Sequence, residues 1–192
     1  MNTICITNRK IAEENGLDFL EQIERVAKKR PFKIILREKD LSETDYKKLA
    51  GKCFEICRKY NIEFAVNKFI AVAKDIGIKN IHLSATDFFE NVNDLSFFEC
   101  TGVSIHSKEE AKRAEKSGAD YLIAGHIFKT DCKKDIPPRG VGFLKEICNS
   151  VKIPVFAIGG ITSENACDCI KNNASGVCLM SSFMKSENIH ML

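Results

Sequence analysis

The chain has 192 residues, with 29 basic and 26 acidic side chains and a hydrophobic share of 44%. At about 150 residues per domain this length predicts one domain, and the 13 Phe residues can build a core, which excludes an intrinsically disordered protein. The net charge of +3 argues against a nucleic-acid-binding protein, and the sequence has no apolar run near the about 20 residues that a membrane span needs. A polar turn follows the first apolar run too early for a secretory signal, so we expect a cytoplasmic protein.

Short apolar runs alternate with helical patterns along the whole chain. The runs are rich in β-branched and aromatic residues, as is typical of strands that are buried on both faces. They predict strands at residues 3–7, 32–36, 63–66, 80–83, 102–105, 121–124, 155–158 and 176–180.

The intervals between these strands have helical periodicity. Residues 17–30 place apolar side chains on one stripe and charges opposite, and Ser42 followed by Asp45 predicts the start of another helix. The stretch after Leu83 is less regular and predicts a short helical turn and a loop. Further helices are expected at residues 69–76, 108–117, 142–149 and 163–172.

Eight strands separated by helices, with no break in composition, predict a single α/β domain over residues 1–192, a (β/α)8 TIM barrel. Such barrels usually have about 250 residues, so this one must be of minimal length. The chain ends soon after the eighth strand, and the last helix is therefore expected to be short or incomplete. The rival fold is a doubly wound open sheet, but residues 7–10 (Thr-Asn-Arg-Lys) lack the glycine-rich turn that would support it.

The nine cysteines show no Cys-x-x-Cys pair and no zinc-finger spacing. We expect most of them to be small buried hydrophobic residues in a reducing compartment, rather than disulfides or metal ligands. Cys132 is the exception because it lies in a polar loop.

The ends of the last two predicted strands indicate a phosphate site. In a TIM barrel the reactive groups lie at the C-terminal ends of the strands. Gly159-Gly160 follow one strand and Ser181-Ser182 the next, and a helix is expected to begin just after the glycines. Exposed backbone N–H groups and a helix N-terminus favour an anion, although ordinary turn glycines and helix caps would give the same pattern.

Two further groups of polar residues follow predicted strands. Arg37 and Lys39 bracket Glu38, so they share one face and can point together at an anion, although a surface ion pair fits the spacing equally well. His126 ends an apolar strand next to the predicted phosphate site, and we interpret it as a catalytic acid/base. The loop over residues 128–140 is expected to be an anion-attracting lid rather than a solvated charge run.

We interpret the two other histidines near strand ends, His82 and His106, as structural residues. His82 lies inside an apolar strand, and His106 precedes a helix that is expected to begin near Ser107.

Several strand-end segments together resemble the thiamine phosphate synthase/TenI superfamily. The resemblance covers nearly the whole chain except the last helix, and it implies a (β/α)8 barrel. The segments that carry it are LREKDLSE, VNK, GVSIHS, AGHIFKTDCKK, RGVGFL and IPVFAIGGIT. It implies that substrate is bound by Arg37, Lys39, Asn67, Ser104, Thr130 and Lys133, and phosphate by Gly159, Gly160, Ser181 and Ser182.

Departures from the synthase pattern favour the TenI branch, which includes thiazole tautomerases. Ile35 stands where the synthase pattern has Gln, and Lys68 stands where that pattern has an Asp that helps to hold Mg²⁺. Asp87 matches the second acidic position, but a single carboxylate is a poor magnesium site. The resemblance therefore implies an isomerase that converts a carboxylated thiazole phosphate to the aromatic thiazole phosphate through His126, with no metal and no cofactor.

Two alternatives stay open beside the tautomerase. One is a thiamine phosphate synthase, a transferase that joins thiazole phosphate to a pyrimidine diphosphate and uses Mg²⁺. The other is a TenI-type regulatory protein without catalysis, although the sequence has no basic recognition helix. The expected partner is a small-molecule thiazole phosphate, with no nucleic acid and no membrane, and a homo-oligomer is left open.

Overall fold

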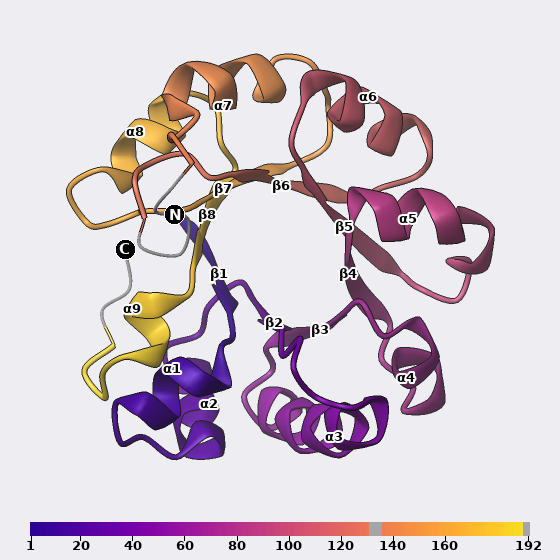
Figure 1. Ribbon diagram of the computed structural model, residues 1–192, viewed down its shortest axis with the longest axis vertical. Helices are drawn as coiled ribbons and strands as arrows, with labels where there is room; N and C mark the ends of the chain where they lie inside the picture. The colour runs from indigo at the N-terminus through magenta and orange to yellow at the C-terminus, as the bar shows by residue number, and fades with distance from the viewer. Residues whose placement is uncertain (131–135, 190–192) are drawn as a thin grey trace.

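The computed structural model describes residues 1–130 and 136–189 and forms a closed barrel of parallel strands surrounded by helices (Figure 1). The strands pair in chain order, and β1 pairs with β8 to close the barrel. They are β1 Asn2–Ile6, β2 Lys33–Leu36, β3 Glu63–Asn67, β4 Asn80–Ser84, β5 Cys100–Ile105, β6 Tyr121–Gly125, β7 Val155–Ile158 and β8 Gly176–Leu179. The predicted (β/α)8 TIM barrel is confirmed.

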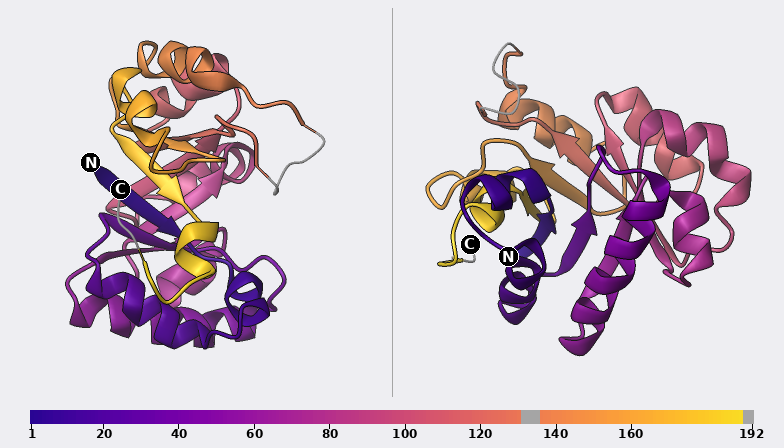
Figure 2. Two further views of the ribbon diagram at one scale, coloured as in Figure 1. Left: turned by 90° about the vertical axis from the view of Figure 1, so that its left-hand side faces the viewer. Right: turned by 60° about the horizontal axis from the view of Figure 1, so that its bottom comes forward.

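The helices lie outside the barrel, and each strand is followed by helical structure (Figures 1 and 2). The last helix has four residues, which confirms the expected short closing helix. The helices are α1 Arg9–Glu14, α2 Phe19–Lys28, α3 Glu43–Lys59, α4 Ile70–Asp75, α5 Ala85–Asn91, α6 Lys108–Lys116, α7 Gly140–Cys148, α8 Ala166–Lys171 and α9 Ser181–Met184, with a 3₁₀ turn at Val92–Asp94 after α5.

Two helices differ from the sequence prediction. Helix α1 was not predicted, although Asn8 caps it by accepting a hydrogen bond from the Ile11 N–H over 3.3 Å. Helix α8 begins at Ala166, three residues after the predicted start at residue 163, because the side chain of Asn165 accepts the Thr162 N–H and holds a turn before the helix. Both differences concern residues that follow a strand end at the mouth of the barrel.

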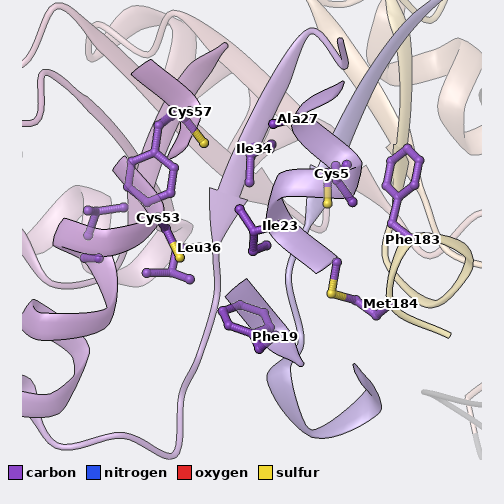
Figure 3. Close-up of a cluster of buried hydrophobic side chains, with 14 of the residues drawn as sticks. Cys5, Phe19, Ile23, Ala27, Ile34, Leu36, Cys53, Cys57, Phe183 and Met184 are labelled. Atoms are coloured by element: carbon purple, nitrogen blue, oxygen red, sulfur yellow. The ribbon is translucent and has the colours of Figure 1, made fainter. Parts of the chain in front are cut away.

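The main core lies between the barrel and its helices. Figure 3 shows one part of it, in which Phe19 and Ile23 of α2 face Cys5, Cys53 and other buried side chains. The eight cysteines among the described residues are free thiols, and most of them are buried. Burial raises the pKa of the Cys57 thiol to about 12, so this thiol stays protonated at neutral pH. Cys132 lies outside the described residues.

A buried glutamine holds the short α9 against the rest of the barrel. The Gln22 side chain, on α2, donates to the backbone carbonyls of Phe183 over 2.7 Å and of Ser186 over 2.8 Å. Because α9 is too short to satisfy these carbonyls within its own backbone, this side chain completes its C-terminal hydrogen bonding.

The inside of the barrel forms a separate core of side chains from the strands. Most of these side chains are apolar, among them Ile4, Ile35 and Phe156, but Lys33 and His82 also lie there and are 1% and 3% exposed. The segments on either side of residues 131–135 project beyond one end of the barrel (Figure 2). Among the described residues, no helix is long and apolar enough to cross a membrane.

Candidate active site at the mouth of the barrel

The predicted site residues come together at the C-terminal ends of the strands. Because all strands run parallel, the residues that end or follow them share one end of the barrel, where TIM barrels carry their active sites. Arg37 and Lys39 follow β2, Asn67 ends β3, Ser104 lies near the end of β5, Gly159 and Gly160 follow β7, and Ser181 and Ser182 begin α9. Thr130 is half-buried, and Lys133 lies outside the described residues.

Three cations gather above β2 and β3. The positive charge of Arg37 is the main cause that lowers the pKa of Lys39, with burial and the charge of Lys68 adding to it and Asp87 opposing it. Within residues 1–130 and 136–189, none of these three cations forms an ion pair. The surface ion pair that the spacing of Arg37 and Lys39 left open is therefore absent from the described part of the chain. Unpaired cations held near one another favour binding of a polyanion.

Glu38 does not neutralise this cluster because it points the other way. Its carboxylate is 3% exposed and accepts hydrogen bonds from the Thr7 hydroxyl over 2.6 Å and from the Arg9 N–H over 2.9 Å. The Thr7 Oγ1 in turn accepts the Arg37 N–H over 2.9 Å. Burial raises the pKa of Glu38, although these hydrogen bonds oppose the shift. Glu38 thus joins the ends of β1 and β2 and fixes the backbone from which Arg37 projects.

Asn67 is held in place by a main-chain carbonyl and by a tyrosine hydroxyl. Its side-chain Nδ2 donates to the His82 carbonyl over 2.9 Å, and its N–H donates to the Tyr46 hydroxyl over 3.0 Å. Tyr46 itself donates to the Leu36 carbonyl over 2.6 Å, so one phenol joins the ends of β2 and β3. Lys68 follows in the left-handed backbone region, with φ of 74°, and its side chain is exposed.

The residues at the end of β4 do not fit a magnesium site. Ser84 caps α5, because its Oγ accepts the Asp87 N–H over 3.1 Å, and its hydroxyl donates to the Asp87 Oδ2 over 2.6 Å. The described residues contain no group of three His, Cys, Asp or Glu side chains that could hold a metal. One carboxylate near Lys39, whose ammonium also interacts with the charges of Arg37 and Lys68, leaves the local charge positive, which disfavours a divalent cation.

The two glycines after β7 lie in tight contact with the segment that follows β6. Both have positive φ, 102° at Gly159 and 64° at Gly160. A Cβ atom at Gly160 would lie 2.2 Å from the Lys129 carbonyl oxygen, and one at Gly159 would lie 2.4 Å from the His126 Cβ. Since α8 begins only at Ala166, the helix N-terminus that the sequence predicted next to these glycines is wrong. Their role in binding phosphate stays a prediction.

His126 is buried and holds the ends of the loop that follows β6. Its Nε2 lies 3.1 Å from the Ile136 carbonyl oxygen, and because a carbonyl only accepts, Nε2 carries the proton. The His126 carbonyl accepts the Arg139 N–H over 3.0 Å, and the Ile127 carbonyl accepts the Gly140 N–H over 3.0 Å. The predicted lid over residues 128–140 includes residues outside the described part, so this prediction stays open.

His82 was interpreted only as structural, but the structure places it directly beneath a predicted site residue. Its Nε2 lies 2.8 Å from the Ser104 Oγ, and its Nδ1 lies 3.2 Å from the Tyr121 hydroxyl. Burial, followed by the charges of Lys33 and Arg37, lowers the pKa of His82 to about 3. The imidazole is therefore neutral at all pH values at which the protein would work.

A pH-dependent loss of stability follows from this buried histidine. The unfolded chain takes up a proton at His82 below about pH 6.5, whereas the folded chain does not until about pH 3. Acidification through this window therefore lowers the free energy of unfolding by about 1.4 kcal/mol per pH unit from His82 alone. In urea titrations at pH 7.0, 6.0 and 5.0, we expect the His82→Asn variant to lose less stability on acidification than wild type. Equal slopes would contradict the buried neutral state.

Comparisons with known proteins show which family this chain belongs to. A family model described as thiamine monophosphate synthase matches residues 3–183. The chain belongs to the thiamine monophosphate synthase family. It is 38% identical over 182 residues to a putative thiamine-phosphate synthase 2 of Aquifex aeolicus, with 94% of this chain and 96% of the relative covered. It is 36% identical over 186 residues to a thiamine-phosphate synthase of Clostridium acetobutylicum, with 96% and 87% covered.

A solved structure from the same family has the same fold. The thiamine phosphate pyrophosphorylase of Pyrococcus furiosus superposes with a TM-score of 0.83 at 28% identity, over 98% of this chain and 89% of the other. The predicted resemblance to the thiamine phosphate synthase/TenI superfamily is confirmed.

The predicted tautomerase function is contradicted by these comparisons. The curated relatives that match nearly the whole chain at 32–38% identity carry the name thiamine-phosphate synthase, which favours the synthase alternative over the isomerase. The error came from giving the substitutions at Ile35 and Lys68 more weight than the similarity of the whole chain. The proton relay through His126 was argued for the isomerisation and is withdrawn with it.

Proposed function

We propose that this protein is a thiamine-phosphate synthase, a transferase that joins a thiazole phosphate to a pyrimidine diphosphate and releases diphosphate. The observation that supports this most is the full-length similarity to proteins of that name, 36% identity over 186 residues for the Clostridium acetobutylicum relative. The three cations above β2 and β3, which form no ion pair within the described residues, agree with it, because the leaving diphosphate carries several negative charges. The cytoplasmic location expected from the composition belongs to this proposal.

Each substrate would bind at its own side of the barrel mouth. Arg37, Lys39 and Lys68 would hold the diphosphate, and their charge would stabilise it as the bond to the pyrimidine methylene carbon breaks. The thiazole phosphate would lie across the mouth, on Gly159-Gly160 and the start of α9. Its ring nitrogen then forms the new carbon–nitrogen bond. Holding both substrates in one mouth supplies orientation that the free reactants lack.

Magnesium was expected only if the synthase alternative held, and the donor set at the end of β4 fits it poorly. The Asp87 carboxylate accepts the hydroxyl of Ser84, which caps α5, and the Lys39 ammonium lies close enough to both Asp87 and Lys68 for their charges to interact. We propose instead that these ammonium groups and the Arg37 guanidinium neutralise the diphosphate. The chemistry of this chain would then depend on its own cations for charge neutralisation.

A condensation assay tests the proposed function. The purified protein is incubated with the pyrimidine diphosphate and the thiazole phosphate, with MgCl₂ in one series and with EDTA in another, and thiamine phosphate and diphosphate are both quantified. We expect the two products to appear in equal amounts, at rates that differ by less than about fivefold between the series, because a cation already neutralises the leaving group. Absence of product in both series would overturn the synthase assignment. Product in the magnesium series alone would overturn only the metal-independence.

A further inference from the structure

A hydrogen-bonded column runs inside the barrel beneath the mouth, and we call Ser104, His82 and Tyr121 the interior column. Ser104 is half-buried at the mouth, His82 lies below it and the Tyr121 hydroxyl lies below His82, with contacts of 2.8 Å and 3.2 Å. His82 and Tyr121 are 3% and 4% exposed, so protein groups rather than solvent decide the direction of these hydrogen bonds.

The chemistry of Tyr121 sets the direction of the column. Within the described residues, the His82 Nδ1 is the hydrogen-bond partner of the Tyr121 hydroxyl. If Nδ1 carried the proton, it would donate to the phenol oxygen and leave the phenol O–H buried without an acceptor, which costs about 1–3 kcal/mol. The phenol therefore donates to Nδ1, which makes Nε2 the protonated nitrogen, and Nε2 donates to the Ser104 oxygen.

Burial keeps His82 neutral, and a cation at the bottom of the barrel adds to this effect. The Lys33 ammonium lies 4.5 Å from the centre of the Tyr121 ring, 3.1 Å from the Glu63 carboxylate and 3.2 Å from the Cys100 sulfur. Its charge adds to burial in keeping His82 unprotonated. An imidazolium would donate from both nitrogens and reverse the hydrogen bond with Tyr121, so burial, with the charge of Lys33 adding to it, preserves the direction of the column.

The neighbouring strand makes room for the phenol. A Cβ atom at Gly102 of β5 would lie 2.0 Å from the Tyr121 Cζ and 2.4 Å from its hydroxyl oxygen. Any side chain at this position would displace the ring, so Gly102 permits the phenol to reach His82. Gly102 and His82 are also direct partners in the pairing of β4 with β5.

We propose that His82 is a positioning residue that, oriented by Tyr121, donates its Nε2–H to Ser104 and thereby turns the Ser104 hydroxyl proton toward a hydrogen-bond acceptor on the pyrimidine diphosphate. This inference rests on the proposed function, because it names that substrate. The Ser104 hydroxyl then donates in a fixed direction. Ser104 lies on β5, which is separated by one strand from β3, and Asn67 and the cations lie at the ends of β2 and β3. A hydroxyl already oriented does not lose rotational freedom when the substrate binds.

The tautomer can be measured without any substrate. The protein is labelled with ¹⁵N-histidine, long-range ¹H–¹⁵N spectra are recorded between pH 8 and pH 5, and the His82 signals are assigned by their loss in His82→Asn. We expect an imidazole protonated at Nε2 throughout this range. In Tyr121→Phe, which keeps the ring, we expect the Nδ1 resonance to move downfield because it loses its hydrogen bond. A proton on Nδ1, or an imidazolium at pH 6, would overturn the proposal.

Kinetics test whether His82 acts through Ser104. We expect His82→Leu and Ser104→Ala each to raise the KM for the pyrimidine diphosphate about tenfold, and the double variant to lose no more than either single variant. His82→Gln, whose amide can donate to Ser104, should recover part of the loss. Additive losses, or no recovery by Gln, would overturn the positioning role. Thermal unfolding of each variant separates this result from misfolding, and Tyr121→Phe supplies a milder variant if His82→Leu does not fold.

These two experiments also separate the inference from the proposed function. If wild type makes no thiamine phosphate, the synthase assignment fails, but calorimetric binding of the pyrimidine diphosphate to wild type and to His82→Leu still tests the positioning role. Equal affinities would overturn it. If wild type condenses the substrates and the histidine spectra show the opposite tautomer, the inference fails while the function stands.

Discussion

Gly160→Ala is expected to abolish most condensation activity and to lower the free energy of unfolding by about 3 kcal/mol. The added Cβ would lie 2.2 Å from the Lys129 carbonyl oxygen and 2.8 Å from that of Phe128, both of which are backbone atoms. The φ of 64° is also unfavourable for alanine. The loop must therefore move away from the segment after β6, and the backbone that we propose binds phosphate moves with it. Urea unfolding and the condensation assay measure the two effects.

Gly142→Ala is the matched control for this substitution. Gly142 lies within α7, its φ is not positive, and a Cβ atom there would meet nothing within 4 Å. The same methyl group should therefore raise the free energy of unfolding by about 0.5–1 kcal/mol through helix propensity, with activity unchanged. If Gly160→Ala behaved like Gly142→Ala, the loop after β7 would not bind the thiazole phosphate in the geometry described.

Arg37→Ala is expected to raise the KM for the pyrimidine diphosphate by about a hundredfold, because a guanidinium held near a polyanion typically contributes about 2–5 kcal/mol to binding. Glu38 and Thr7 fix the backbone of Arg37, so the loss reflects the missing charge and not a disordered strand end. The KM for the thiazole phosphate should change by less than about threefold, because that substrate would lie across the mouth.

Arg58→Ala is the control for removal of a positive charge. Its guanidinium forms an exposed ion pair with Glu55 over 2.7 Å, on the outer helix α3. Such pairs contribute at most about 1 kcal/mol to stability and should not affect either KM. Equal increases in both KM values for Arg37→Ala would contradict the division of the mouth into two anion sites, and an unchanged KM for the diphosphate would exclude Arg37 from it.

The strands were predictable because their sequences are apolar on both faces. In a closed parallel barrel one face of each strand packs in the interior and the other packs under helices, so every strand is a nearly continuous apolar run. Because both faces of each strand are apolar, the sequence does not show which residues point into the barrel. His82 therefore could not be recognised as the partner of Ser104, and the inward direction of Lys33 could not be recognised either. Asn8 was a usable signal for α1, but six residues are too few to show helical periodicity.

The location of the site could be predicted from the sequence, but the reaction could not. The rule that active sites lie at the C-terminal ends of the strands brought Arg37, Asn67, Ser104 and Gly160 to one end of the barrel. The tautomerase and the synthase would both hold a thiazole phosphate there, so the glycine and serine loops do not distinguish them. The charge at Lys68 was interpreted as excluding condensation. An ammonium group, like a metal ion, can neutralise a leaving diphosphate.

The hydrogen bonds from Gln22 to the carbonyls of Phe183 and Ser186 join parts of the chain that are 161 and 164 residues apart. The serines that begin α9 are therefore anchored by a helix from the opposite end of the sequence, next to the pairing of β1 with β8. Contacts of such sequence separation form late, because the entropy of closing the chain must be overcome first. Because the proposed phosphate site includes these serines, ribosome-bound or truncated chains should be unable to bind a phosphate ester. Saturating phosphate should raise the free energy of global unfolding of the complete chain.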